Sequence, residues 1–312
     1  MTDLQIAITA GAAIALCWVL IVNFRERQRA RKLLGAPLST AVEPVFSGLP
    51  ERMPESVLPN AISESVATLR WQVPCAVSRI QTELRGWRHV GSKPLAFGWI
   101  GTEGAEPVAM PDTDSVAALQ IGVLLATRGG PLHAMEYAEW QEGLARLAGV
   151  LGAQLEIPSM GDVLARAKKL DQQCADVDAQ LSICVTADEV LSNSAIAAAA
   201  GAAGLESRGE SRYAMGPLHG QRFSVFPGDK GVSLVLLLDV PRAADPLTAF
   251  DEMRTAAHVL AQALSGRVTD DNGRELTEQD FEQMSLLIAQ RDQQLMDLGI
   301  APGSLVAQRL FL

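Results

Sequence analysis

Residue types that commonly perform catalysis occur in this chain, but their spacing matches no known reactive arrangement. The four histidines, His89, His133, His219 and His258, are isolated from one another. None belongs to an H-E-x-x-H segment or a closely spaced His/Cys pair, the patterns that bind zinc, and none has a neighbouring acid that indicates a catalytic triad. We therefore expect no metal site and no catalytic residue at these positions.

Motifs for phosphate binding and nucleophilic attack are missing as well. The sequence contains no G-x-x-x-x-G-K-[ST], G-x-G-x-x-G or G-x-S-x-G segment, so it lacks the loops that hold phosphates or expose a reactive serine. The remaining carboxylate candidates are Asp171, Asp270 and Asp271. Asp171 falls on a charged helix face and the other two fall at a predicted turn, so we interpret all three as solvated acids. We therefore predict that the chain is not an enzyme and that it binds no cofactor.

The composition excludes disorder throughout and disfavours one class of partner. The chain has 312 residues, of which 48% are apolar and 20% charged, which is typical of about two folded domains. Its formal net charge is −10, so it lacks the basic surface that neutralises phosphates. Nucleic acid is therefore not expected to be a partner.

One uncharged apolar segment near the N-terminus indicates a membrane span. Leu4–Val22 would form a helix of about 28 Å, which matches the hydrocarbon thickness of about 30 Å. A signal peptide or a buried helix fits less well, because Asp3 precedes the segment and charged residues follow it. The flanking basic residues are Arg25, Arg27, Arg29, Arg31 and Lys32. By the positive-inside rule they predict a short N-terminus outside and a cytoplasmic globular part.

Two later segments of the chain look like copies of one unit. The apolar runs 119–126 and 232–239 lie 113 positions apart, and a helical pattern follows each run at the same offset. The matched core positions are Tyr137, Trp140, Leu144, Leu147 and Leu151 in the first copy, and Phe250, Met253, Ala257, Leu260 and Leu264 in the second. Strands at 68–73 and 180–185, followed by helices at 76–87 and 190–203, are predicted to begin the copies.

The end of the second copy carries clear local signals. Asp271-Asn272-Gly273 predicts a tight hairpin turn, and Thr277 to Asp280 resembles a capping box before a final amphipathic helix. Runs of predicted strands are interrupted by helices at intervals. This order predicts an α+β fold in which an antiparallel sheet carries its helices on one face. The predicted parts are a transmembrane anchor (1–24), a basic and proline-containing linker (25–65), a diverged first copy (66–176) and a second copy (178–312).

The residues of the second copy resemble the ZipA family of bacterial cell-division proteins, which link the tubulin-like FtsZ to the inner membrane. The segments 239–250, 256–261 and 266–277 are similar to the family's strand, helix and D-D-x-x-R-x-x-T hairpin. The order of span, basic stretch, linker and globular domain is similar too. The resemblance covers about 178–298, and it reaches the first copy only through the internal repeat.

The resemblance implies a membrane-anchored division protein that binds the C-terminal peptide of FtsZ on an open apolar sheet face and tethers the Z ring to the inner membrane. Alternation along the strand would point Leu234, Leu236 and Leu238 toward the helices. The predicted partner-binding groove comprises Cys184, Tyr213, Phe226, Val235 and Leu237. Two alternatives stay open here: the first copy covers that face, or the strand is buried on both sides.

Three further expectations follow from departures from the family pattern. Gly122 and Leu124 of the first copy stand where the second copy has Val235 and Leu237, so the first copy is expected to bind less well or to bind a different ligand. The tail 304–312 is extra, and it is expected either to add a strand or to occupy the groove in the same molecule. The alternative function is a membrane-anchored scaffold or sensor that binds another protein or a small ligand through the paired domains.

Overall fold

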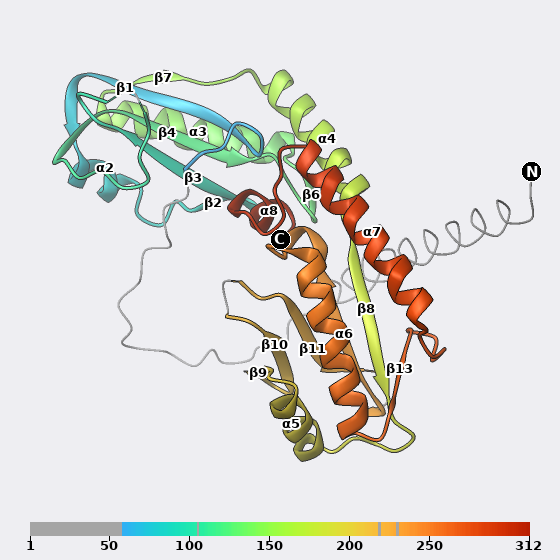
Figure 1. Ribbon diagram of the computed structural model, residues 1–312. Helices are drawn as coiled ribbons and strands as arrows, with labels where there is room; N and C mark the ends of the chain where they lie inside the picture. Colours follow the sequence, from blue (N-terminus) through green and yellow to red (C-terminus); the bar gives the residue numbers. More distant parts are fainter. Residues whose placement is uncertain (1–57, 105, 218–219, 229–230) are drawn as a thin grey trace, which may run out of the picture. The chain divides into compact units, whose positions relative to one another are not determined.

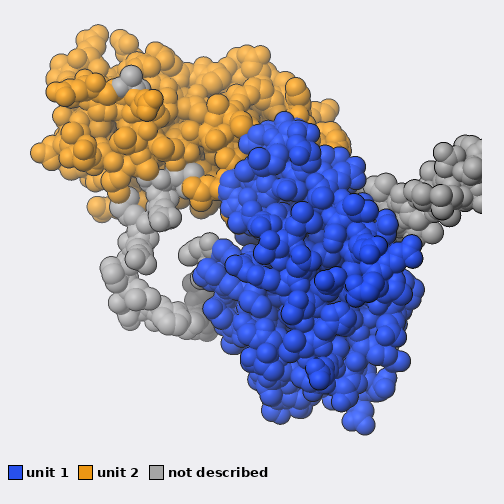
Figure 2. Space-filling view, viewed as in Figure 1, with its two compact units in different colours: residues 1–45, 178–304 blue, residues 46–177, 305–312 orange. Residues whose placement is uncertain are grey.

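The computed structural model describes residues 58–312 apart from 105, 218–219 and 229–230. Two compact units divide this part of the chain (Figure 2). Within it, unit 1 holds residues 178–304, and unit 2 holds residues 58–177 together with 305–312. The last residues of the chain therefore fold with the earlier part of the sequence, whereas the predicted domain range 178–312 included them with the second copy.

Unit 1 is an antiparallel sheet with its helices on one face (Figure 1). Its strands are ordered β13-β8-β12-β11-β10-β9. In chain order its elements are β8 (Gln180–Thr186), α5 (Asn193–Ala202), β9 (Glu206–Gly209), β10 (Arg212–Met215), β11 (Phe223–Pro227), β12 (Ser233–Asp239), the 3-10 turn η2 (Val240–Arg242), α6 (Pro246–Ala263), β13 (Arg267–Thr269) and α7 (Glu278–Asp297).

The core of unit 1 lies between this sheet and α5, α6 and α7. Apolar side chains at helical spacing, such as Phe250 and Met253 of α6 and Phe281 of α7, are almost completely buried against the strands. The small Ala199 and Ala200 of α5 are buried in the same cluster. Because a helix with small residues approaches its neighbours closely, this alanine-rich helix has a packing role.

The hairpin and the helix cap predicted near the end of unit 1 are both confirmed. Thr269 bridges to Glu275 across the turn, and Gly273 adopts a φ of 83°, a conformation that glycine adopts readily. The Thr277 side chain accepts a hydrogen bond from the Asp280 amide, and the Asp280 carboxylate accepts one from the Thr277 amide. This reciprocal capping box starts α7 at a defined residue.

Unit 2 is built from a five-stranded antiparallel sheet ordered β2-β3-β4-β1-β7. Its elements are β1 (Glu64–Ala76), α2 (Val77–Glu83), β2 (His89–Val90), β3 (Lys93–Ile100), β4 (Ser115–Leu124), the short pair β5 (Ala126–Thr127) and β6 (Gly130–Pro131), α3 (Ala134–Leu151), β7 (Gln154–Glu156), α4 (Met160–Val177) and, from the end of the chain, α8 (Leu305–Leu310). The predicted helical core positions Trp140, Leu144 and Leu147 of α3 are fully buried.

The two sheets have the same order of corresponding strands. Read from one edge, unit 2 runs β7-β1-β4-β3-β2 and unit 1 runs β13-β8-β12-β11-β10, with β9 added at the far edge. A long helix follows the central strand in both units (α3 after β4, α6 after β12), and another follows the edge strand (α4 after β7, α7 after β13). This shared order supports our proposal that the units are diverged copies of one domain.

The predicted fold class is corrected in one respect. The antiparallel α+β architecture is present, but none of the helices within the described residues 58–312 is long and apolar enough to cross a membrane. The long helices α3, α4, α6 and α7 carry charged residues along their length, and the apolar α5 spans only about 15 Å. The predicted transmembrane segment Leu4–Val22, the linker up to residue 57 and the basic residues Arg25, Arg27, Arg29, Arg31 and Lys32 lie outside the described residues.

Candidate functional site

The central strand β12 sets the arrangement of the candidate site. It lies between β8 and β11, and its antiparallel register places Val235 opposite Cys184 on one side and opposite Phe226 on the other. Residues directly opposite in an antiparallel pair point to the same face of the sheet. These three side chains therefore form one row across the sheet. Leu237 lies in the next row of the same face.

The two faces of β12 differ sharply in burial. Leu234, Leu236 and Leu238 are all 0% exposed and pack in the core under the helices. Val235 and Leu237 alternate with them and are only half-buried, as is Phe226 of β11. The alternation predicted for this strand is therefore confirmed. We call Cys184, Phe226, Val235 and Leu237 the open strip.

Tyr213 does not belong to this face, and its predicted placement is wrong. Its register partner in β11 is Val225, which is buried in the helix-facing core, and Tyr213 is part of the same cluster. The open-face residue of β10 is Ala214, opposite Ser224. Simple alternation along the sequence could not predict which face of the sheet each β10 side chain points to. The reason is that Glu210 and Ser211, just before the strand, form a turn with positive φ.

Cys184 is an apolar member of the strip and not a nucleophile. Its side chain is buried, and this desolvation, with a smaller contribution from the nearby charges of Asp271 and Asp270, raises the pKa of the thiol to about 11. The thiol is thus protonated at neutral pH. A protonated, buried thiol behaves as a small hydrophobic group.

Polar side chains border the open strip, and the sequence analysis did not identify them. Ser182 lies opposite Leu237, and the Ser224 hydroxyl lies 3.5 Å from the Leu237 carbonyl oxygen. Thr186 and Thr269 hydrogen-bond to each other through their hydroxyls at 2.9 Å. Spacing by two residues from Cys184 along β8 is the signal that would have found Ser182 and Thr186.

The acids of the hairpin have a structural function. The guanidinium of Arg274 donates to both carboxylate oxygens of Asp280 at 3.0 Å and to Asp270 at 3.3 Å. These hydrogen bonds, with those from Thr277, hold the pKa of Asp280 down at about 2. The D-D-x-x-R-x-x-T segment therefore fixes the hairpin to the start of α7, and it is not a reactive site.

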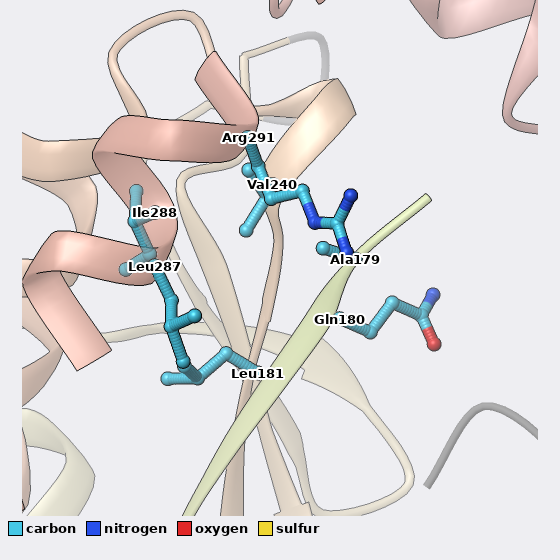
Figure 3. A pocket seen from close by; sticks show the side chains of 7 residues that line it. All are labelled: Ala179, Gln180, Leu181, Val240, Leu287, Ile288 and Arg291. Atoms are coloured by element: carbon cyan, nitrogen blue, oxygen red, sulfur yellow. The ribbon is translucent and has the colours of Figure 1, made fainter. Parts of the chain in front are cut away.

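Two hollows lie on the helix side of unit 1 and differ in size. One is a small cavity of about 30 Å³ where Leu287 and Ile288 of α7 face Leu181 of β8 (Figure 3). It has room for a solvent molecule but not for a peptide side chain. The other is an open depression of about 500 Å³ between α6 and α7, and its lining includes Leu247 and the largely exposed Leu286. This depression is the rival apolar surface in unit 1.

The residue types considered for metal binding are dispersed in the structure. Within the described ranges, no group of three or more His, Cys, Asp or Glu side chains is placed to hold a metal ion. His133 caps the start of α3, and the His258 ring packs near the ring of Phe281. Cys75 and Cys174 are buried among apolar side chains. These histidines and cysteines therefore have packing or capping contacts.

Comparison with protein families matches part of unit 1. Residues 227–286 match the family model described as ZipA, C-terminal FtsZ-binding domain. The matched range spans β12, α6, β13 and the start of α7, and it includes Val235 and Leu237 of the open strip. No curated protein matches the chain. This part of unit 1 is therefore similar to the C-terminal FtsZ-binding domain of the ZipA family.

Proposed function

We propose that unit 1 binds the C-terminal peptide of FtsZ on the open strip and acts in this way in bacterial cell division, at the division site. One observation carries the proposal: Val235 and Leu237 are only half-buried, on the sheet face opposite the one that packs in the core. The family match over residues 227–286 supports the identity of the partner. This is a binding function, which needs no catalytic residue.

Apolar burial would provide most of the affinity. Each buried Å² of apolar surface contributes about 25 cal/mol, so covering the strip with apolar peptide side chains favours the complex. The hydroxyls of Ser182 and Ser224 beside Leu237 are placed to hydrogen-bond to a polar side chain or backbone group. Because FtsZ is a polymer that presents many tails, a micromolar single contact would suffice for strong overall attachment.

The test is a titration of the full chain with the FtsZ C-terminal peptide. Leu237→Asp places a charge in the strip and should weaken binding by at least about tenfold, or about 1.4 kcal/mol. Leu286→Asp is the matched control, because it introduces the same change on the exposed outer face of α7, in the rival depression.

The two variants distinguish the possible outcomes. Loss of binding in Leu237→Asp alone supports the open strip. Loss in Leu286→Asp alone would place the peptide between α6 and α7. An absence of binding by the unmodified chain would contradict the proposed function and favour the scaffold or sensor role.

A further inference from the structure

The C-terminal segment of the chain is seated in unit 2, and it is not part of the domain that precedes it in the sequence. Residues Leu305–Leu310 form α8, and Ala307, Leu310 and Phe311 are almost completely buried there. The tail thus neither adds a strand to unit 1 nor occupies its open strip. Both of the expectations drawn from the sequence are wrong.

The strand register identifies the sheet face near which the tail binds. Leu69 of β1 faces the same side as Trp71, whose indole donates to the Leu151 carbonyl at the end of α3. That side is therefore the helix-covered side. Glu64 and Gly122 point to the other face: a Cβ on Gly122 would lie 3.3 Å from the Glu64 side chain and 3.1 Å from Pro59.

Arg309 is the main polar contact between the tail and this face. Its Nη1 lies 3.0 Å from Oε1 of Glu64, and its Nη2 donates to the Pro94 carbonyl of β3 at 3.3 Å. Glu64 is 1% exposed and Arg309 is 9% exposed, so water screens this ion pair little. Because Glu64 is buried, any segment that binds at this place must provide one cationic side chain to pair with it.

Arg128 makes a second contact, at the very end of the chain. Its Nη1 donates to the Phe311 carbonyl at 2.8 Å, and its guanidinium lies 5.5 Å from the centre of the Phe311 ring. This cation–π geometry favours an aromatic side chain at that position. Together the contacts select an apolar C-terminal helix with an arginine followed two residues later by an aromatic residue.

The position matches the open strip of unit 1. In unit 2 Glu64 pairs with Leu124 and Val66 pairs with Gly122; in unit 1 Ser182 pairs with Leu237 and Cys184 with Val235. The corresponding strands hold the same places in the two sheets. Glu64, which pairs with Arg309, therefore corresponds in position to Ser182 of unit 1, the residue opposite Leu237.

We propose that the open face of unit 2 is a second peptide-binding site, specific for a C-terminal apolar helix with an arginine, and that residues 305–312 occupy it in cis. Pro59 and Pro107 lie over Gly98 on the same face. The face of the unit 2 sheet that corresponds to the open strip of unit 1 thus binds a segment of its own chain. This inference does not depend on FtsZ binding by unit 1.

The experiment removes residues 305–312 from the full chain and adds a labelled synthetic peptide of residues 303–312. The truncated chain should bind the peptide at least tenfold more tightly than the intact chain, because the intact chain already holds its own tail at a high effective concentration. The Arg309→Gln peptide should lose most of this affinity. The Leu305→Ser peptide is the matched control and should bind like the unmodified one, since Leu305 is 63% exposed.

A second measurement keeps the test decisive if truncation destabilises unit 2. Binding of the peptide to the folded state should then raise the Tm of the truncated chain, and the increase should grow with the logarithm of peptide concentration above the Kd. Trp71, Trp87, Trp99 and Trp140 all lie in unit 2, so tryptophan fluorescence in a Trp18→Phe background follows this unit.

Three results would overturn the inference. They are equal peptide binding by the truncated and intact chains, no effect of Arg309→Gln in the peptide, and absence of both binding and a Tm increase. Leu237→Asp in the truncated chain should leave binding of the tail peptide unchanged. If that variant removes it, the peptide has bound to unit 1, and the inference fails while the proposed function of unit 1 stands.

Discussion

Leu236 and Leu237 are neighbours on β12 but point to opposite faces of the unit 1 sheet. Leu236 is fully buried with Ile183 and Val225 under the helices, whereas Leu237 lies half-exposed beside Ser182. Two residues of the same type in one strand therefore have different functions. The first stabilises the domain and the second is available to a ligand.

Alanine substitutions should separate these functions. Leu236→Ala removes buried methyl groups from a packed core and should lower the free energy of unfolding by about 2–5 kcal/mol. Leu237→Ala should lower the free energy of unfolding by about 1 kcal/mol or less, yet it should weaken binding of the FtsZ peptide. Chemical denaturation followed by far-UV circular dichroism, with peptide titration of both variants, measures the two effects. Equal destabilisation by both variants would show that Leu237 is a core residue.

The buried ion pair of unit 2 gives a second prediction. Burial raises the pKa of Glu64, and Arg309 opposes that shift, so removing Arg309 leaves a buried carboxylate without its counter-charge. Arg309→Ala should destabilise unit 2 by about 3–5 kcal/mol. The double variant Glu64→Gln with Arg309→Met should recover most of this loss. Denaturant unfolding followed by tryptophan fluorescence measures the stability of these variants. A loss of less than about 1 kcal/mol in Arg309→Ala would indicate an exposed, screened ion pair.

The hairpin network predicts a pH dependence of unit 1. Asp280 has a pKa of about 2 in the folded state, against an ordinary value of 3.8. A lowered carboxylate pKa adds stability that is fully present above about pH 4 and is lost as the pH falls toward 2. Asp280→Asn should therefore flatten the acid side of the stability profile between these values. An unaltered profile in Asp280→Asn would contradict the assignment.

Gly122 tests whether the open face of unit 2 is filled. A side chain there would meet Pro59 at 3.1 Å and Glu64 at 3.3 Å. Gly122→Val, which introduces the residue that unit 1 has at the corresponding position, should destabilise unit 2 by about 1–3 kcal/mol through overpacking. Gly149→Val is the spatial control, because a Cβ at Gly149 meets no atom within 4 Å. Its cost should be no more than the ordinary helix penalty of valine, and equal large losses at both sites would refute the filled-face account.

The local features of unit 1 were predictable because they depend on short-range physics. Strict alternation in 233–239 sets which leucines enter the core. Asn-Gly sets the turn at 272–273, and the Thr277 capping box sets the start of α7. Each of these signals uses residues that are close in sequence.

The errors come from contacts between residues far apart in the sequence. Tyr213 follows a left-handed turn that changes the register of a short strand, so its face depended on its pairing with Val225. The tail pairs Arg309 with Glu64, 245 positions earlier, and no local pattern indicates that contact. The predicted membrane segment Leu4–Val22 lies outside the described residues, and no helix within 58–312 is long and apolar enough to cross a bilayer.

Methyl NMR of the full chain with the FtsZ C-terminal peptide tests the central claim most directly. The open-strip account predicts shifts of the Val235 and Leu237 methyl signals, with those of Leu234 and Leu236 much less affected because the helices cover them. The signals of Leu247 and Leu286 should stay in place. Saturable shifts at Leu247 and Leu286, with Val235 and Leu237 unmoved, would contradict the account.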